Sequence, residues 1–193
     1  GTDVHSYTAS IIGCSRQDAK AHTFKPLYGG VSGTPAQQAY YTAFKEKYEK
    51  VADWHKELEK EAVKTKEIKL PSGRTYSFPD AKWTEWGAAT NRTAICNYPV
   101  QGFATADLLP IALVELDKVM RKLRMESVIC NTVHDSIVLD VHPDEKDQCI
   151  KVLSEAMLSI SDGSKARYGL EYDMPIGIEL KIGNNWLDLH EIQ

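Results

Sequence analysis

Several features that would narrow the class of this protein are missing from its 193 residues. No apolar run approaches the roughly 18 to 20 uncharged residues that span a bilayer. The first residues, Gly1 to His5, lack the basic and then apolar pattern of a secretory signal. The four cysteines are widely spaced and form no Cys-x-x-Cys pair, so neither a zinc finger nor a disulfide framework is indicated. We therefore expect an intracellular protein with reduced cysteines and no membrane partner.

A strong excess of charge is also missing. The chain carries 23 basic and 27 acidic residues, for a net charge of −4. This balance argues against binding of nucleic acid through the charge of the whole surface, although a local basic groove stays possible. The sequence is 42% hydrophobic with 12 glycines and 8 prolines, which is typical of a folded domain. Its length predicts one domain or one lobe of a larger protein.

Helix signals dominate the first third of the chain. A helix is predicted from Asp3 to a break at Gly13, and a second one from about Ser15 to Gly29-Gly30, with a kink at Pro26. Apolar residues at spacings of three and four predict one long amphipathic helix over residues 35–66. Most of the Lys and Glu side chains in that helix are expected to face solvent.

Strand signals are short and scattered. We predict strands at residues 68–70, 75–79, 128–133, 137–141 and 175–182. A break over residues 97–102 is expected to precede a helix that runs through Leu123, and a further helix is predicted over residues 144–160. Because strands and helices mix without a regular strand-helix-strand alternation, the predicted fold class is α+β.

A polar tip separates the two strands predicted at 128–133 and 137–141. It consists of His134, Asp135 and Ser136. A carboxylate on a rigid hairpin can hold Mg²⁺ together with substrate phosphates. An ordinary polar turn is the alternative, because a single carboxylate does not by itself indicate a metal site.

The second predicted helix carries Arg16, Lys20, Phe24 and Tyr28 at intervals of four residues. Four such residues share roughly a third of the helix face and span about 18 Å along its axis. Two cations and two aromatic rings suit a nucleotide, with phosphates against the cations and the base and sugar against the rings. The alternative is an amphipathic helix whose aromatic residues belong to the core.

Amide and guanidinium groups gather near the break at 97–102. Arg92, Asn97 and Gln101 could donate hydrogen bonds to phosphates or to base edges in a minor groove. Since Asn-x-Pro is also a common loop sequence, a plain loop is the alternative.

Together these sites resemble the C-terminal part of an A-family DNA polymerase, the DNA polymerase I type, in the forms carried by bacteriophages. Four segments carry the resemblance in the order of the family. They are Arg16-x-x-x-Lys20-x-x-x-Phe24-x-x-x-Tyr28-Gly29 for motif B, Asn97-Tyr98-Pro99-Val100-Gln101-Gly102 for the primer–template segment, Val133-His134-Asp135 for motif C, and Gly183-Asn184-Asn185-Trp186 for the terminal Gly-x-x-Trp. The resemblance covers nearly the whole chain.

The resemblance implies a DNA-directed DNA polymerase, which transfers nucleotides from dNTPs to a primer 3′-hydroxyl under the direction of a template. Residues 1–95 would form most of the fingers subdomain, and residues 96–193 would form the C-terminal part of the palm with the motif C hairpin. Primer–template DNA and dNTP are the implied partners. The cell would be a phage-infected or prophage-carrying bacterium.

The resemblance also implies roles for the nucleotide-binding residues. Arg16 and Lys20, with His5, would hold the dNTP phosphates, and Lys20 would donate a proton toward the leaving pyrophosphate. Phe24 would pack on the sugar and base. Tyr28 would sit at the nascent base pair.

The remaining roles concern DNA and metal. Arg92, Asn97 and Gln101 would contact the primer–template minor groove, and His134 would contact the primer terminus. Asp135 would bind the two catalytic Mg²⁺ ions of the complete active site.

Some positions depart from the pattern of the family. The second catalytic aspartate of the family lies in motif A, which has no candidate here, and Ser136 stands where motif C usually has Glu. The spacing from His5 to Arg16 is shorter than in bacterial members, and Arg92 is one residue further from Gln101. We therefore expect a split polymerase or an excised fragment that is inactive without an N-terminal part.

Two alternatives to this polymerase part remain. One is a non-catalytic DNA-binding or interaction module derived from a polymerase. The other is a stand-alone Mg²⁺-dependent nuclease around His134 and Asp135. The nuclease would need more carboxylates near the hairpin, and the nearest candidates are Asp140 and Asp144.

Overall fold

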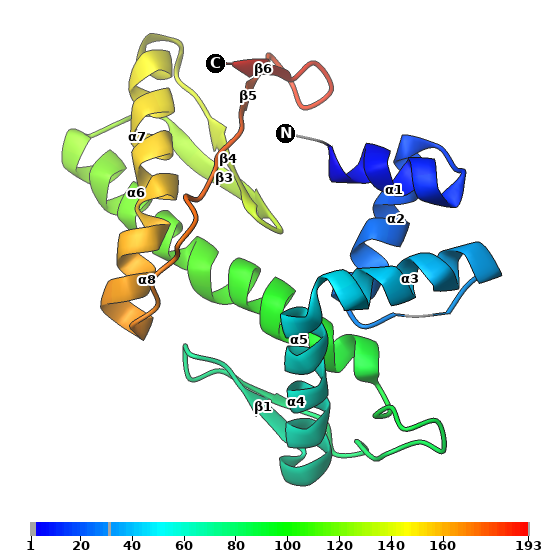
Figure 1. The fold of residues 1–193 in the computed structure, drawn as a ribbon. Helices are drawn as coiled ribbons and strands as arrows, with labels where there is room; N and C mark the ends of the chain where they lie inside the picture. The colour runs from blue at the N-terminus through cyan, green and yellow to red at the C-terminus, as the bar shows by residue number, and fades with distance from the viewer. Residues whose placement is uncertain (1–2, 31, 193) are drawn as a thin grey trace. The chain divides into compact units, whose positions relative to one another are not determined.

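The computed structural model describes residues 3–30 and 32–192. Helices and small antiparallel strand pairs are combined in it, which confirms the predicted α+β class (Figure 1). The chain divides into two compact units. Unit 1 extends up to Gln101 and unit 2 begins at Gly102.

Unit 1 begins with two packed helices, α1 (Val4–Ile12) and α2 (Arg16–Leu27). The Asp3 carboxylate caps α1, which ends at Gly13 with a φ of 76° that favours glycine. The Ser15 hydroxyl accepts a hydrogen bond from the backbone N–H of Asp18 and caps α2. Both predicted helices are confirmed because local signals mark their ends. Pro26 lies in the last turn of α2, and the helix ends one residue later.

The prediction of one long helix over residues 35–66 is wrong. The structure has α3 (Pro35–Lys47) and α4 (Glu49–Thr65), with a non-helical residue, Tyr48, between them (φ −117°, ψ 57°). Helix α3 packs on α1 and α2, whereas α4 packs on a strand. A break at Tyr48 lets each helix bury its apolar face against its own neighbours.

The prediction of a break over residues 97–102 is also wrong. Helix α5 (Arg92–Phe103) runs through this segment with Pro99 inside it. A proline inside a helix costs about 3 kcal/mol. Packing of α5 offsets this cost, because Ile95 and Cys96 are fully buried and the Tyr98 ring lies on the predicted strand pair. The two strands predicted here are present as β1 (Glu67–Lys69) and β2 (Thr75–Ser77), which pair antiparallel.

Ring contacts show how α5 meets the strand pair. The centroid of the Tyr98 ring lies 5.2 Å from that of Tyr76 and 5.9 Å from that of Phe78. Such distances are those of favourable aromatic pairs.

Unit 2 is built around a helix pair and a hairpin (Figure 1). A π-helical turn, η1 (Ala104–Leu108), leads into α6 (Leu109–Leu123), which packs on α7 (Lys146–Leu158). The hairpin strands β3 (Val128–Val133) and β4 (Ser136–Asp140) pack on the core between these helices through partly buried residues. That core consists of Leu116, Met120, Val152 and Ala156.

The end of unit 2 differs from the prediction. The segment predicted as one helix begins with a 3₁₀ turn, η2 (Pro143–Glu145), before α7, and α8 (Ile160–Tyr168) follows as a separate helix. The predicted strand over 175–182 is reduced to β5 (Leu180–Ile182), which pairs with the unexpected β6 (His190–Ile192). None of the described helices combines the length and apolarity needed to cross a membrane.

Candidate functional site

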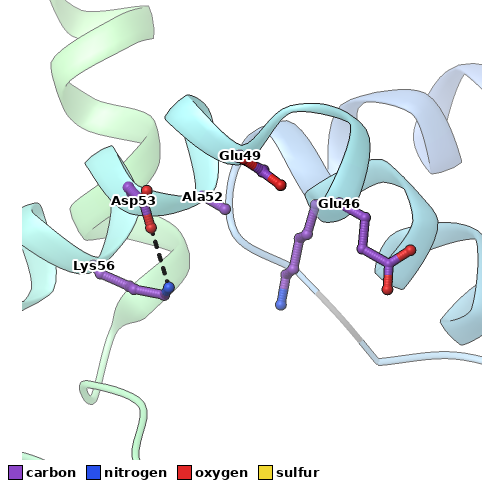
Figure 2. Close-up of a pocket in the computed structure, with 6 residues that line it drawn as sticks. Glu46, Glu49, Ala52, Asp53 and Lys56 are labelled. Carbon is purple, nitrogen blue, oxygen red and sulfur yellow. Dashed lines mark hydrogen bonds and ion pairs between the residues drawn. The ribbon is translucent and has the colours of Figure 1, made fainter.

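An open pocket of about 370 Å³ lies on unit 1 where α3 gives way to α4 (Figure 2). Charged side chains of both signs line it, and Lys56 donates to Asp53 across 3.1 Å. The lining residues are Lys45, Glu46, Glu49, Ala52, Asp53 and Lys56. None of these is a predicted site residue. The predicted nucleotide-binding residues lie instead along a helix face.

That face belongs to α2 and its C-terminal cap. Phe24 is 44% exposed, so this ring is not a core residue, and it stacks on the ring of Tyr28 with centroids 6.4 Å apart. Arg16 is exposed and Lys20 is half-buried in the same helix. An aromatic pair of exposed Phe24 and half-buried Tyr28, continuing a line of two cations, is consistent with a surface for a nucleotide.

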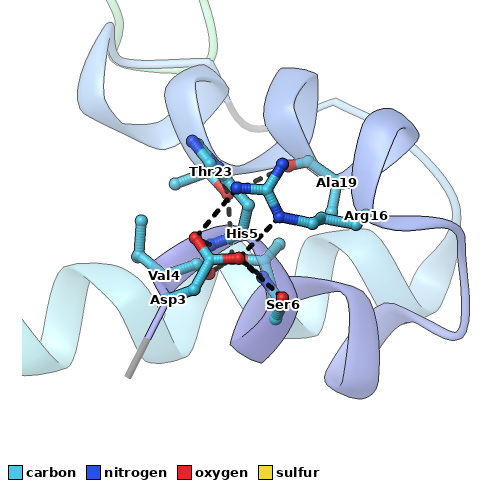
Figure 3. A network of polar contacts seen from close by, with 8 residues as sticks. Asp3, Val4, His5, Ser6, Arg16, Ala19 and Thr23 are labelled. Atoms are coloured by element: carbon cyan, nitrogen blue, oxygen red, sulfur yellow. Dashed lines mark hydrogen bonds and ion pairs between the residues drawn. The ribbon is translucent and has the colours of Figure 1, made fainter. Parts of the chain in front are cut away.

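Arg16 forms an ion pair with the cap of α1 (Figure 3). Its Nε donates to Oδ2 of Asp3 across 2.7 Å. The guanidinium, followed by the Ser6 hydroxyl, holds the pKa of the Asp3 carboxyl well below its usual range. The side chains of Arg16 and Asp3 are 56% and 39% exposed, and exposed ion pairs contribute little to stability. A phosphate could therefore replace Asp3 as the partner of Arg16.

His5 joins the same face from α1. Its Nδ1 lies 3.2 Å from Oγ1 of Thr23 (Figure 3), and its ring meets the Phe24 ring edge-on with centroids 5.5 Å apart. The structure therefore brings His5 of α1 against Phe24 of α2, 19 residues later in the sequence. Sequence analysis gave no indication of the contact with Thr23.

Arg92 has a structural role that the sequence did not indicate. Its Nε donates to Oε1 of Glu59 across 2.7 Å, and its Nη1 donates to the carbonyl of Gly29 across 2.8 Å. The other Glu59 oxygen accepts the backbone N–H of Ala89. The side chains of Arg92 and Glu59 are only 18% and 5% exposed. Arg92 therefore ties α4 and α5 to the end of α2.

Glu59 is also a correction to the sequence analysis. Most Lys and Glu side chains of this segment were expected to face solvent, but Glu59 is buried. Burial near Arg92 also lowers the pKa of His55 and of Lys45, in both cases with loss of hydration as the main cause. In a helix rich in Lys and Glu, the sequence does not indicate which single charged residue, such as Glu59, is buried.

Two of the predicted DNA-contacting residues, Asn97 and Gln101, lie in α5. Nε2 of Gln101 donates a hydrogen bond to the hydroxyl of Tyr28, which links it to the α2 face. Asn97 lies one turn earlier in α5 and is half-buried. The predicted nucleotide-binding residues and the predicted DNA-contacting residues therefore lie in unit 1, with the exception of His134, which lies in unit 2.

His134 and Asp135 lie in unit 2, at the two-residue turn between β3 and β4. Val133 pairs with Ser136 across the turn, and Ser136 Oγ donates to the Val133 carbonyl across 2.9 Å. His134 has a φ of 52°, a left-handed conformation in which His is more frequent than most residues. Both His134 and Asp135 are exposed, as a ligand-binding hairpin tip requires.

The described residues do not complete a metal site around Asp135. Among residues 3–30 and 32–192, no group of three or more His, Cys, Asp or Glu side chains is placed to hold a metal ion. Asp140 lies at the far end of β4, paired with Val128. One exposed carboxylate can fill a single ligand position, whereas a two-ion site needs further carboxylates.

Comparison with known proteins decides the family. A family model described as DNA polymerase family A matches residues 1–188. The chain belongs to DNA polymerase family A. This membership confirms the resemblance seen in the four sequence segments.

Relatives of the chain within family A are much longer proteins. DNA polymerase I of Lactococcus lactis subsp. lactis (strain IL1403) is 28% identical over 210 residues, which cover 97% of this chain and 23% of that protein. The DNA polymerase of Bacillus phage SP01 is 31% identical over 147 residues, which cover 75% of this chain and 16% of that protein. The chain thus spans less than a quarter of the length of these two relatives.

A solved structure supports the fold of this family A chain. It is the POL domain of Pol1 from M. smegmatis in complex with DNA primer-template and dNTP. The similarity has a TM-score of 0.66 at 23% sequence identity and covers 83% of this chain and 31% of that one. At this identity the likeness shows a shared fold.

Proposed function

We propose that this family A chain is the C-terminal portion of a DNA-directed DNA polymerase, with most of the fingers in residues 1–95 and part of the palm in residues 96–193. The observation that carries the proposal is the α2 face, with exposed Arg16 and Phe24 and half-buried Lys20 and Tyr28, in a chain matched by the family model over residues 1–188. The similarity to a phage polymerase supports a phage-infected or prophage-carrying bacterial cell as its setting.

The α2 face would bind the incoming dNTP. Arg16, Lys20 and His5 would hold the triphosphate, and Lys20 would donate a proton toward the leaving pyrophosphate. Phe24 would pack on the sugar and base. Tyr28, whose ring stacks on that of Phe24, would sit at the nascent base pair.

Primer–template DNA would be contacted by Asn97, Gln101 and His134, whose side chains can donate to the minor groove and primer terminus. Arg92 would add a contact through Nη2, because its Nε and Nη1 already donate to Glu59 and Gly29. Its main contribution would be to hold the end of α2 in place.

Asp135 would supply one carboxylate ligand to Mg²⁺. Two such ions, when bound, polarise the primer 3′-hydroxyl and stabilise the leaving phosphate oxygens. The described residues form no group of three or more candidate metal ligands, and a separate N-terminal polymerase part would supply the motif A aspartate. The runner-up function is a non-catalytic DNA-binding module.

Reconstitution tests this proposal. The purified 193-residue chain is expected to show no Mg²⁺-dependent primer extension, and addition of the N-terminal part of a related polymerase, including motif A, is expected to restore it. Extension by the chain alone would show that its own residues complete the site. DNA binding without extension in any combination would favour the non-catalytic module.

Substitution of Lys20 by alanine tests the nucleotide face. We expect the single-turnover rate of nucleotide addition in the reconstituted enzyme to fall by about 100-fold or more, as for loss of a general acid, while the affinity for DNA changes little. Lys56→Ala is the matched control, because Lys56 is exposed in α4 and forms an exposed ion pair with Asp53. A loss of DNA affinity at an unchanged rate would contradict the role of Lys20.

A further inference from the structure

One buried histidine of unit 1 has a nitrogen without a partner. His55 of α4 is 2% exposed, and its Nε2 forms no hydrogen bond to any residue that the structure describes. A hydrogen bond links the ring to the backbone carbonyl of Leu27, the last residue of α2. Because a carbonyl only accepts and Nε2 has no partner, Nδ1 of His55 donates to Leu27. His55 therefore connects α4 to the C-terminal end of α2.

A second side chain holds the backbone just beyond α2. Arg92 of α5 donates from Nη1 to the carbonyl of Gly29 across 2.8 Å. Gly29 has a φ of 77°, and a Cβ there would lie 3.2 Å from Sγ of Cys96 and 3.4 Å from Nε of Arg92. The backbone at Gly29 therefore passes tightly along α5. Carbonyls at the end of a helix lack partners within it, and here α4 and α5 supply the donors.

Tyr28 lies between these two anchored residues. Its backbone has left the helix, with a φ of −106° and a ψ of 25°, and its hydroxyl accepts a hydrogen bond from Nε2 of Gln101. Its ring stacks on that of Phe24. The direction of the Tyr28 side chain therefore depends on how firmly Leu27 and Gly29 are held.

The junction of helices around His55 suits only a neutral ring. Two cations act on it, Arg92 from α5 and Lys45 from α3, together with one anion, Glu59 from α4 itself. The Glu59 carboxylate already pairs with Arg92, whose Nε donates to it across 2.7 Å. Burial, followed by the charge of Arg92, lowers the pKa of His55 below its usual value. A proton on Nε2 would add a third cation and a buried donor without an acceptor.

We propose that His55 is a positioning residue that fixes Tyr28 through the Leu27 carbonyl, and that it does so only while its ring is neutral. A protonated ring regains hydration only by leaving the junction, and the hydrogen bond to Leu27 is lost with it. The part that concerns the nascent base pair rests on the function proposed above. The part that concerns the hold on Leu27 does not.

NMR of the 193-residue chain tests the hold on Leu27. At neutral pH the ¹⁵N shifts of the His55 ring are expected to show the hydrogen on Nδ1. On acidification the ring is expected to stay neutral below about pH 6.5, the value for an unperturbed histidine. The backbone amide signals of Tyr28 and Gly29 are expected to change in the same pH range as the ring signals of His55. A ring that titrates at about pH 6.5, or one that titrates without a change at Tyr28, overturns the proposal.

Two substitutions of His55 separate the donor from the charge. The amide nitrogen of asparagine can take the place of Nδ1 but does not titrate, so His55→Asn is expected to keep the Tyr28 and Gly29 signals in place and to remove their pH dependence. His55→Phe lacks a donor and is expected to shift these signals at neutral pH as well. A pH response of Tyr28 that persists in His55→Asn would belong to another group and would overturn the proposal.

Two lysines provide a matched control. Lys45→Gln removes a cation that acts on His55 and is expected to raise the pKa of the ring. Lys56→Gln removes an exposed cation that lines the same pocket as Lys45 and pairs with Asp53, and it is expected to leave the pKa of His55 unchanged. Equal shifts in both variants would show that the junction does not set the charge state of His55.

Kinetics of the reconstituted polymerase separate positioning from function. His55→Phe is expected to lower the ratio of kcat/KM for a matched over a mismatched dNTP by about five- to tenfold, the size of one hydrogen bond, and His55→Asn is expected to retain this ratio. The unsubstituted enzyme is expected to lose discrimination as the His55 ring is protonated, whereas His55→Asn is not. If the NMR results hold but discrimination does not change, the role of Tyr28 at the base pair is wrong while the positioning stands. If extension cannot be reconstituted, the NMR arm still decides the positioning.

Discussion

Replacement of Asp135 by alanine is expected to abolish primer extension by the reconstituted polymerase. The carboxylate stands exposed at the turn between β3 and β4, where it can reach a ligand. Charge stabilisation by metal ions contributes several kcal/mol to phosphoryl transfer, so loss of a ligand is expected to slow the reaction by roughly 1000-fold or more.

The expected loss at Asp135 is one of activity and not of folding. Asp135 is a turn residue outside the core of unit 2, so the thermal melting of Asp135→Ala is expected to match that of the unsubstituted chain. Asp140→Asn is the control, since Asp140 is an exposed carboxylate at the other end of β4 and is expected to be dispensable. Full extension by Asp135→Ala would show that the motif C assignment is wrong.

Replacement of Glu59 by alanine is expected to cause the largest loss of stability. The substitution leaves the Arg92 guanidinium without a carboxylate and the Ala89 backbone N–H without its acceptor. Breaking a buried ion pair in this way costs about 3–5 kcal/mol of the free energy of unfolding. Denaturant unfolding followed by circular dichroism measures this loss.

Two comparisons isolate the effect of burial at Glu59. Glu57→Ala breaks an exposed pair with Lys60 on the same helix and is expected to change stability little. The double variant Glu59→Leu, Arg92→Met removes both charges and is expected to recover most of the lost stability. Equal losses for Glu59→Ala and Glu57→Ala would show that the Arg92 pair does not stabilise unit 1.

Predictions from the sequence succeeded where a short segment contains its own signal. Asp3, Gly13 and Ser15 mark the ends of α1 and α2 through local capping and backbone conformation. The two strand pairs predicted at β1–β2 and β3–β4 were found because β-rich runs flank short polar turns. Each of these signals acts over a few residues, so it can be interpreted from the local sequence without knowledge of the tertiary fold.

Predictions failed where packing overrode the local signal. Pro99 suggested a break, yet α5 continues because Ile95 and Cys96 are buried and Tyr98 packs on distant rings. At Tyr48 the opposite occurred, since no glycine or proline marks the break between α3 and α4. Both outcomes depend on neighbours that the local pattern does not contain.

The sequence by itself determined the line of Arg16, Lys20, Phe24 and Tyr28, because the pitch of a helix places residues four apart on one side. It also determined the order of the segments that mark family A. Only the tertiary structure decided the partners of these residues. The hydrogen bonds from Arg92 to Glu59 and to Gly29 span 33 and 63 residues. The hydrogen-bonded hydroxyl groups of Tyr40, Thr8 and Thr23 join three helices. Such contacts depend on which helix faces pack together, and no spacing within one segment encodes that choice.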